Sequence, residues 1–495
     1  MSPILLLIIF LLYTLLMFGV SWVTSRKATN DTYFIGNRKS PWYIVAYGMI
    51  GASLSGVTFI SVPGWVYTTQ FSYLAMVIGY LAGYATIVYV LLPLYYRLHL
   101  TSIYTYLGER FGVWSHKTGS GCFIVSRVIG AAFRMYIVIN VLQLFIFDAW
   151  KVPFMVTTLI FIIFIIFYTF KGGVKTIVWT DTLQTTFMLL GLIVSLCLIV
   201  KELGFGFDGL FNTVINSEYS QVIFTDWHDK RFFIKQLLGG AFIAIVMTGL
   251  DQELMQKNLS CKTLKESQRN MLTLSWILVP VNAVFLFLGA ALILYARNNG
   301  IEIPKTTDDL FPTIALQYLS PLAGFVFIIG LISAAYPSAD GAITSLTTAV
   351  SIDFLEIQKK PHLSEKQRLR IRYIVHFSVS ALLILVILIF KAINNQAVIS
   401  KLFTLAGYTY GPLLGLFAFG LLTKFAVRDK LVPAVALFSP FMAWIISELS
   451  VRYLSGYHIG FELLVLNGLI TFTLLWLIRK RNLKTGKVIS AELKS

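Results

Sequence analysis

Among the charged residues inside the long apolar stretches of this sequence are Arg127, Arg134, Asp181 and Asp340. A charge inside a hydrocarbon layer is costly, and the charges that are kept there usually belong to an ion path, a solute site or a proton relay. Carboxylate oxygens suit a hard cation, and a guanidinium group can hold a carboxylate through two hydrogen bonds. These residue types therefore predict reversible binding of a cation or an acidic solute. The alternative is an internal ion pair that only stabilises the fold.

The stretches that hold these residues have the length and composition of membrane spans. Hydrophobic residues make up 57% and charged residues 13% of the 495 positions, whereas about 25% of a soluble domain is charged. A spanning helix needs about 20 apolar residues. The hydropathy of the chain predicts an all-α protein with thirteen such helices, at residues 3–23, 43–68, 73–96, 120–147, 153–170, 176–201, 233–255, 271–296, 321–350, 373–391, 397–423, 430–450 and 461–478.

The net charge of +17 is explained by its distribution along the chain. Most Lys and Arg residues fall in alternate connections between the predicted helices, including residues 257–269, 359–372 and the tail. This bias predicts a multi-pass protein of the cell inner (plasma) membrane, with the N-terminus outside and the C-terminus in the cytoplasm. It also argues against a nucleic-acid partner.

Two of the predicted helices contain breaking residues near their middle. The stretch 48–64 holds glycines, hydroxyl residues and Pro63, and the stretch 239–252 holds Gly239, Gly240 and Gly249. Broken helices at matching places in two halves of a chain are typical of inverted-repeat transporters. Close helix packing is the alternative explanation for the glycines, but the hydroxyl groups coincide with the breaks and favour a binding role.

Four stretches resemble the sodium:solute symporter family, which includes sodium-coupled carriers of glucose, proline, sialic acid, iodide and vitamins. They are Leu54–Pro63, Tyr168–Gln184, Asp251–Lys257 and Ser333–Asp340. Their order agrees with the family, and the resemblance extends over about residues 30–425.

The resemblance implies the LeuT-type fold, in which two inverted repeats of five helices form the core. Residues 1–479 then form one transmembrane domain, with an extra helix at 3–23, the ten-helix core at about 41–424 and two extra helices at 430–478. A short cytoplasmic tail follows at 480–495. The function implied is sodium-coupled symport of a small organic solute by alternating access, in which sodium is the coupling ion and no covalent chemistry takes place.

The resemblance also implies a sodium site. Its ligands would be the backbone carbonyls of Gly51, Leu54 and Ala334 and hydroxyl groups at positions 337 and 338. Ser338 supplies one hydroxyl, but Pro337 departs from the family pattern because it has no side-chain oxygen. We expect Asp340 and Asp181, which matches the family's acidic residue on the fifth core helix, to contribute to cation binding.

Two carboxylates close together repel each other unless a cation or a proton lies between them. Either ion would satisfy this requirement, so proton coupling is an alternative to sodium coupling at Asp340. A structural role for Asp340 through hydrogen bonding is the third possibility.

The candidate solute-binding residues come from the same broken segments and their neighbours. They are Ser53, Ser55, Thr58, Arg134, Met247, Thr248 and Tyr408, with Tyr80, Tyr410 and Arg127 as further candidates. Met247 and Thr248 stand where the family's sugar carriers have aromatic residues. Sialic acid carriers of the family use an arginine two positions before Arg134, where this chain has Ala132.

Other classes of protein fit the sequence less well. A membrane sensor would need an output domain, and the tail is too short for one. The six histidines form no pattern of metal ligands or nucleophile partners, so we expect neither an enzyme nor a metal other than sodium. A channel would show a filter loop or charged rings. The solute remains open between a sugar, sialic acid, another carboxylate, an amino acid and a vitamin, and no obligate protein partner is evident.

Overall fold

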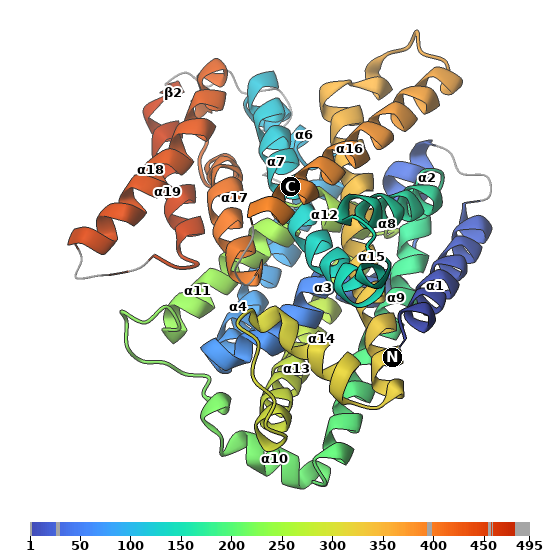
Figure 1. Ribbon diagram of the computed structural model, residues 1–495. Coiled ribbons are helices and arrows are strands. Elements are labelled where there is room, and N and C mark those ends of the chain that lie inside the picture. Colours follow the sequence, from blue (N-terminus) through green and yellow to red (C-terminus); the bar gives the residue numbers. More distant parts are fainter. Residues whose placement is uncertain (1, 26–29, 394–397, 454–456, 458, 481–495) are drawn as a thin grey trace.

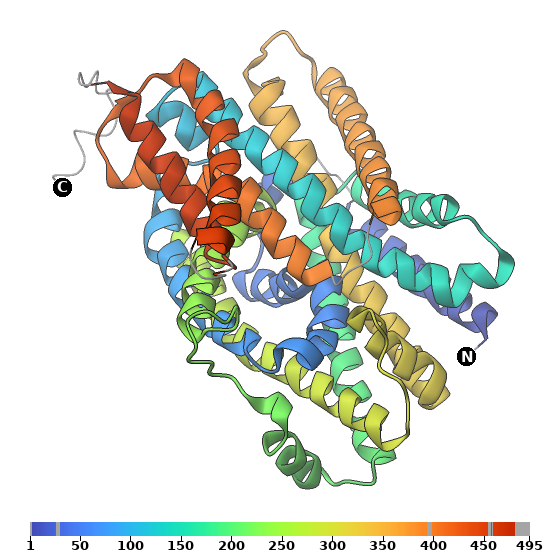
Figure 2. The same cartoon turned by 60° about the vertical axis from the view of Figure 1, so that its left-hand side comes forward.

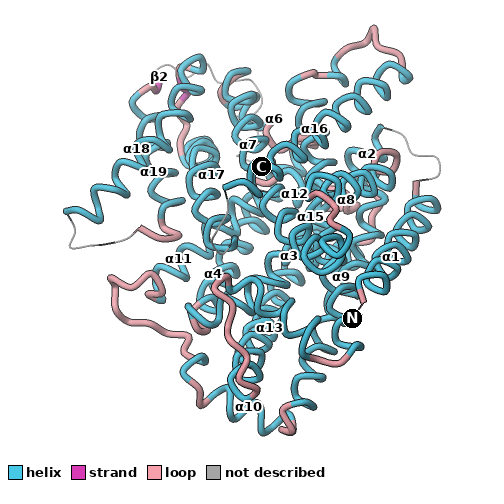
Figure 3. The backbone as a smooth tube through the Cα atoms, in the orientation of Figure 1, coloured by secondary structure: helices cyan, strands magenta, loops and turns pink. Residues whose placement is uncertain are grey.

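The computed structural model describes residues 2–25, 30–393, 398–453, 457 and 459–480, and this part of the chain is almost entirely helical (Figure 3). His458 and the tail 481–495 lie outside the described residues. The longer helices are α1 (Pro3–Thr24), α3 (Trp42–Thr69), α4 (Tyr73–Thr86), α7 (Val113–Leu142), α8 (Phe154–Thr169), α9 (Val174–Glu202), α11 (Phe233–Ala244), α13 (Leu264–Asn298), α15 (Pro321–Ala349), α16 (Glu365–Ile393), α17 (Val398–Leu422), α18 (Val432–Tyr453) and α19 (Leu463–Leu477).

Shorter elements connect these helices. They are α2 (Asn30–Ile35), α5 (Leu92–Arg97), α6 (Thr105–Arg110), α10 (Phe207–Ile215), α12 (Gln252–Asn258), α14 (Leu310–Thr313) and the antiparallel pair of strands β1 (Ala426–Val427) and β2 (Arg479–Lys480). Each segment predicted from hydropathy is mainly helical where the structure describes it. Within the described residues, ten helices are long and apolar enough to span a membrane, or eleven with the bent pair α11–α12, while α8 and α19 are shorter apolar helices.

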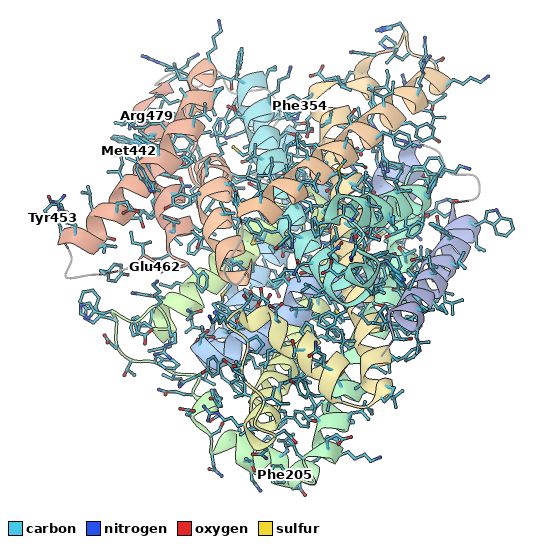
Figure 4. All side chains as sticks on the ribbon, in the orientation of Figure 1. Phe205, Phe354, Met442, Tyr453, Glu462 and Arg479 are labelled. Carbon is cyan, nitrogen blue, oxygen red and sulfur yellow. The ribbon has the colours of Figure 1, made fainter. Side chains whose placement is uncertain are left out.

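The loops of the two predicted membrane faces lie at opposite ends of the molecule. In Figure 1, α10 lies at the bottom and the connection before α11 rises from it along the left side, whereas the connection between α15 and α16 lies at the top, as does β2. Figure 4 places Phe205 at the first end and Phe354 and Arg479 near the second. In Figures 1 and 2, α18 and α19 pack beside α17 along one edge, and α1 packs against α9 and α15 along another.

Helix α3 is broken at Ser55, whose φ of 61° and ψ of 173° lie outside the helical region. A positive φ is uncommon for a residue other than glycine and interrupts the ladder of backbone hydrogen bonds. The second break separates α11 from α12, which are bent by 68°. Asp251 caps the new helix, because its side chain accepts hydrogen bonds from the backbone N–H groups of Glu253 and Leu254. The two interruptions predicted from the sequence are therefore confirmed.

The connection between α13 and α15 folds back into the protein. Leu310 and Phe311 of α14 have no exposed surface, and the Phe311 ring centroid lies 4.7 Å from that of Phe327 and 5.4 Å from that of Phe59. An apolar residue gains most when it leaves water completely, which explains why this segment is buried.

Close backbone contact between α11 and α4 depends on glycine. A Cβ atom built on Gly240 would overlap the carbonyl group of Met76, whereas one built on Gly206 would meet nothing within 4 Å. We expect Gly240→Ala to destabilise the fold by about 1–3 kcal/mol, the usual range for overpacking. Thermal unfolding in detergent measures this change. Gly206→Ala is the matched control and should melt like the native protein, and equal melting temperatures for both variants would contradict the packing described.

Candidate solute and cation site

A cavity lies beside the break in α3, between this helix and α4, α7, α11 and α13. The space between its walls is about 770 Å³, a volume that includes open solvent at its mouth. Six predicted solute-binding residues line it: Ser53, Ser55, Thr58, Arg134, Met247 and Thr248. Tyr80 and Arg127 also line it.

Several buried polar atoms of the cavity wall have no hydrogen-bond partner among the described residues. They include Asn282 Oδ1 and Arg134 Nε. A buried polar group without a partner costs about 1–3 kcal/mol. A polar solute that bonded to these atoms would recover that energy, and this supports a binding role for the cavity. Asn282 is absent from the residues predicted from the sequence, because one asparagine in an apolar helix has no distinctive spacing.

The two arginines of α7 have different surroundings although both line the cavity. Arg127 is 3% exposed. It forms an ion pair with Glu253, and its Nη1 lies 3.6 Å from Asp251 Oδ2. Arg134 has no ion pair or hydrogen bond among the residues described here, and it lines both the cavity and a smaller adjoining pocket. The internal-pair alternative therefore applies to Arg127, while Arg134 is free to bind an anion.

Tyr408 does not line the cavity. Its backbone carbonyl accepts a hydrogen bond of 2.8 Å from Asn467 Nδ2 of α19, which places this residue on the side of α17 toward the C-terminal helices. Tyr410 faces the opposite way, because two residues along a helix turn it by about 200°. It lines the adjoining pocket, and its hydroxyl group donates a hydrogen bond of 2.7 Å to Asp251 Oδ2.

The proposed sodium ligands Ala334 and Ser338 lie on the face of α15 that packs against the broken helix. A Cβ atom on Gly56 of α3 would lie 3.7 Å from the Cα atom of Ala335, and Ser338 follows Ala335 by three residues on the same face. Ser338 is 1% exposed, and its hydroxyl group has no partner within the described ranges. The break at Ser55 lies next to the carbonyl of Leu54 and one turn beyond that of Gly51. An unwound backbone of this kind supplies carbonyl ligands at membrane depth.

Asp340 points to a different side of α15 from Ser338, about 200° around the helix axis. Tyr168 of α8 donates a hydrogen bond of 2.8 Å to Asp340 Oδ2. Asp340 Oδ1 is buried and has no partner in the described part of the chain. Asp181 of α9 is close enough for electrostatic repulsion with Asp340, and its own Oδ1 also lacks a partner there. The oxygens of α15 therefore form two clusters, one around Ser338 and one around Asp340.

Lys257 of α12 joins the second cluster. Its Nζ lies 2.7 Å from Asp181 Oδ2 and 3.5 Å from Glu253 Oε1, and the residue is 2% exposed. The prediction that Lys257 is one of the cytoplasmic loop charges is therefore wrong, since α12 bends back into the protein after the break. The pattern of charges along the chain does not reveal this, because it carries no information on the direction in which a helix bends.

Comparison with known proteins identifies the family. A sequence model of the sodium:solute symporter family matches residues 33–427, and the chain therefore belongs to this family. It is 25% identical to the sodium/sialic acid symporter SiaT of Proteus mirabilis over 458 residues, covering 91% of this chain and 89% of that protein. It is 27% identical to the sodium-coupled monocarboxylate transporter 2 of Homo sapiens over 418 residues, covering 81% and 65%.

Solved structures agree on the fold. A substrate-bound, outward-open sodium-coupled sialic acid symporter superposes with a TM-score of 0.82 at 20% identity, covering 96% of this chain and 99% of that one. The nucleobase–cation symporter Mhp1 in a closed conformation gives 0.54 at 14% identity, covering 90% and 93%. The predicted class, a multi-pass sodium-coupled symporter of small organic solutes, is confirmed. The number of thirteen spans and the internal repeat stay predictions.

We expect sodium to stabilise the purified protein more than potassium does. The Ser338 hydroxyl oxygen and Asp340 Oδ1 lack partners among the described residues, and a small hard cation bound at either cluster would supply one. Melting temperatures at matched concentrations of sodium, potassium and choline chloride measure the effect. Three identical curves would exclude a sodium site that fills without solute.

Proposed function

We propose that this protein imports a small organic acid together with sodium. The proposal is based on the two arginines that line the cavity. Arg127 is ion-paired inside the protein, whereas the Arg134 guanidinium has no ion pair or hydrogen bond in the described part of the chain. Relatives named for sialic acid and for monocarboxylates support an acidic solute. Ser53, Ser55, Thr58, Thr248 and Asn282 provide hydrogen bonds to the remainder of the solute, and Met247 provides an apolar contact.

We propose that the transport cycle takes place in a core of ten helices at about residues 41–424, and that this core consists of two inverted repeats. The matching breaks in α3 and α11–α12, at the first and sixth positions of this core, support it. The protein would lie in the inner membrane with its N-terminus outside, as the distribution of Lys and Arg suggests. It would act without chemical conversion of the solute and without an obligate protein partner.

For the cation we propose two groups of ligands. The carbonyls of Gly51, Leu54 and Ala334 and the hydroxyl of Ser338 form the first, and Asp340 with Asp181 forms the second. The buried oxygens of Ser338, Asp340 and Asp181 that lack partners among the described residues support this assignment. A proton at Asp340 is the alternative occupant of the second group.

Uptake into proteoliposomes tests the solute and the role of Arg134 together. An inward sodium gradient should drive uptake of labelled sialic acid or lactate, but not of glucose or proline. Arg134→Gln should weaken binding of the transported acid by ~1.5–3 kcal/mol, the range for a hydrogen bond to a charged group, while the melting temperature stays unchanged. Sodium-driven uptake of glucose or proline, with neither acid transported, would refute the proposal. Normal acid uptake by Arg134→Gln would remove this residue from the site.

Asp340→Asn tests the second group of cation ligands. The change keeps the shape and removes the charge, so the half-saturating sodium concentration for uptake should rise. Protons compete with sodium for a carboxylate, so the native protein should need more sodium at lower pH, and this dependence should flatten in the variant. Ser345→Ala is the control on the same helix. If Asp340→Asn transports with native sodium dependence and Ser338→Ala does not transport, coupling depends on the first group alone.

A further inference from the structure

A series of buried charges extends from the cavity toward the Asp340 cluster. Arg127 lines the cavity and is ion-paired with Glu253. Lys257 lies between Glu253 and Asp181, and the Glu253 carboxylate lies against Gly341, the residue that follows Asp340. These residues belong to α7, α12, α9 and α15, so the series joins four helices through side chains alone. We call it the charge series.

When all of its carboxylates are ionised, the charge series together with the neighbouring Asp251 and Arg134 holds one negative charge more than its positive charges balance. Its carboxylates and the neighbouring Asp251 carry four negative charges, and Arg127, Arg134 and Lys257 carry three positive charges. Uncompensated charge is expensive in a medium of low dielectric constant. The region therefore favours one additional monovalent cation, either a sodium ion or a proton on Asp340.

Lys257 can exchange partners without any movement of the backbone. Glu253 and Lys257 are four residues apart on α12 and lie on the same face. The Nζ atom is already 2.7 Å from Asp181 and 3.5 Å from Glu253, so rotation about the flexible lysine side chain shifts the ammonium group from one carboxylate to the other. What decides its position is how strongly Arg127 neutralises Glu253.

We propose that Lys257 is a tethered cation that competes with sodium for Asp181, and that the charge series transmits solute binding to this competition. The proposal rests on the proposed function only for the negative charge of the solute. A solute carboxylate held by Arg134 also attracts the Arg127 guanidinium in the same cavity wall and weakens its hold on Glu253. Glu253 then attracts Lys257 away from Asp181, and Asp181 with Asp340 gains affinity for sodium.

The mechanism makes coupling reciprocal. If the solute increases sodium affinity, sodium must increase solute affinity by the same factor. Sodium at Asp181 and Asp340 repels the Lys257 ammonium toward Glu253, which loosens Arg127 from Glu253 and adds its attraction to the anion held by Arg134. Lys257 is thus a positioning residue, since it touches neither the cavity nor the solute.

Sodium titration without any solute tests the competition directly. Thermal unfolding of the purified full chain is followed while sodium chloride replaces choline chloride at constant ionic strength. Lys257→Met should lower the half-saturating sodium concentration by about five-fold or more, the lower end of usual coupling between sites. Lys257→Arg keeps the charge and should remain near the native value. When Lys257→Met is combined with Asp181→Asn, the increase in sodium affinity should disappear, because the Asp181 carboxylate that Lys257→Met makes available is then absent.

Glu253→Gln should shift the half-saturating sodium concentration in the opposite direction. It also tests the proposal if Lys257→Met does not fold. Without the second carboxylate, Lys257 stays on Asp181, so the half-saturating sodium concentration should rise. Opposite shifts for the two residues support competition, because a purely structural role would weaken sodium binding in both variants. Unchanged or weaker sodium binding in folded Lys257→Met, or unchanged or tighter binding in Glu253→Gln, would overturn the proposal.

A second measurement repeats the sodium titrations in the presence of sialic acid or lactate. The concentration of the acid is raised in steps of about 10-fold from roughly 1 μM to 1 mM, the usual range of KM values. The acid that lowers the half-saturating sodium concentration of the native protein should have no such effect on Glu253→Gln. A retained effect would overturn the transmission step. Failure of both acids to bind any variant would count against the proposed solute class, while the sodium shifts of Lys257→Met and Glu253→Gln would still decide the competition.

Discussion

The cost of keeping charge away from water is the constraint on which this structure depends. Arg127, Glu253, Lys257 and Asp181 are nearly inaccessible to solvent, and each is tolerated only because another lies beside it. Removing one member of a buried pair typically costs about 3–5 kcal/mol, since the other charge is left behind. The helices that carry these residues are therefore held in register by electrostatics as well as by packing.

The broken helices follow from the same constraint. A backbone carbonyl that loses its helical partner in a membrane must find another one or line a polar cavity. At Ser55 the break faces the cavity, and at Gly249 the chain turns so that Asp251 can cap α12. The positions where the helices are weakest are consequently the positions where polar ligands are accommodated, and the apolar segments around them remain regular.

The sequence was informative where a single element carries the signal. Hydropathy predicted each long helix, and clustered glycines and hydroxyls predicted both breaks. Six of the seven proposed solute-binding residues line one cavity, because they lie on the broken helices or on one face of α7. The sequence was uninformative where the answer depends on three-dimensional proximity. Lys257 looked like a loop charge, and Tyr408 looked equivalent to Tyr410, since neither the bend of α12 nor the rotation of α17 leaves a mark on composition.

The buried segment around α14 has a mechanical consequence. Gly64 at the end of α3 lies directly against the backbone of Thr307, and Phe311 lies between Phe59 of α3 and Phe327 of α15. The half of α3 beyond Ser55 is thus packed tightly against the connection between α13 and α15, and the two must move together when this half-helix tilts. An antibody fragment that binds the partly exposed stretch 301–306 would restrain the motion of that half-helix. It would therefore slow the transport cycle without contacting the cavity.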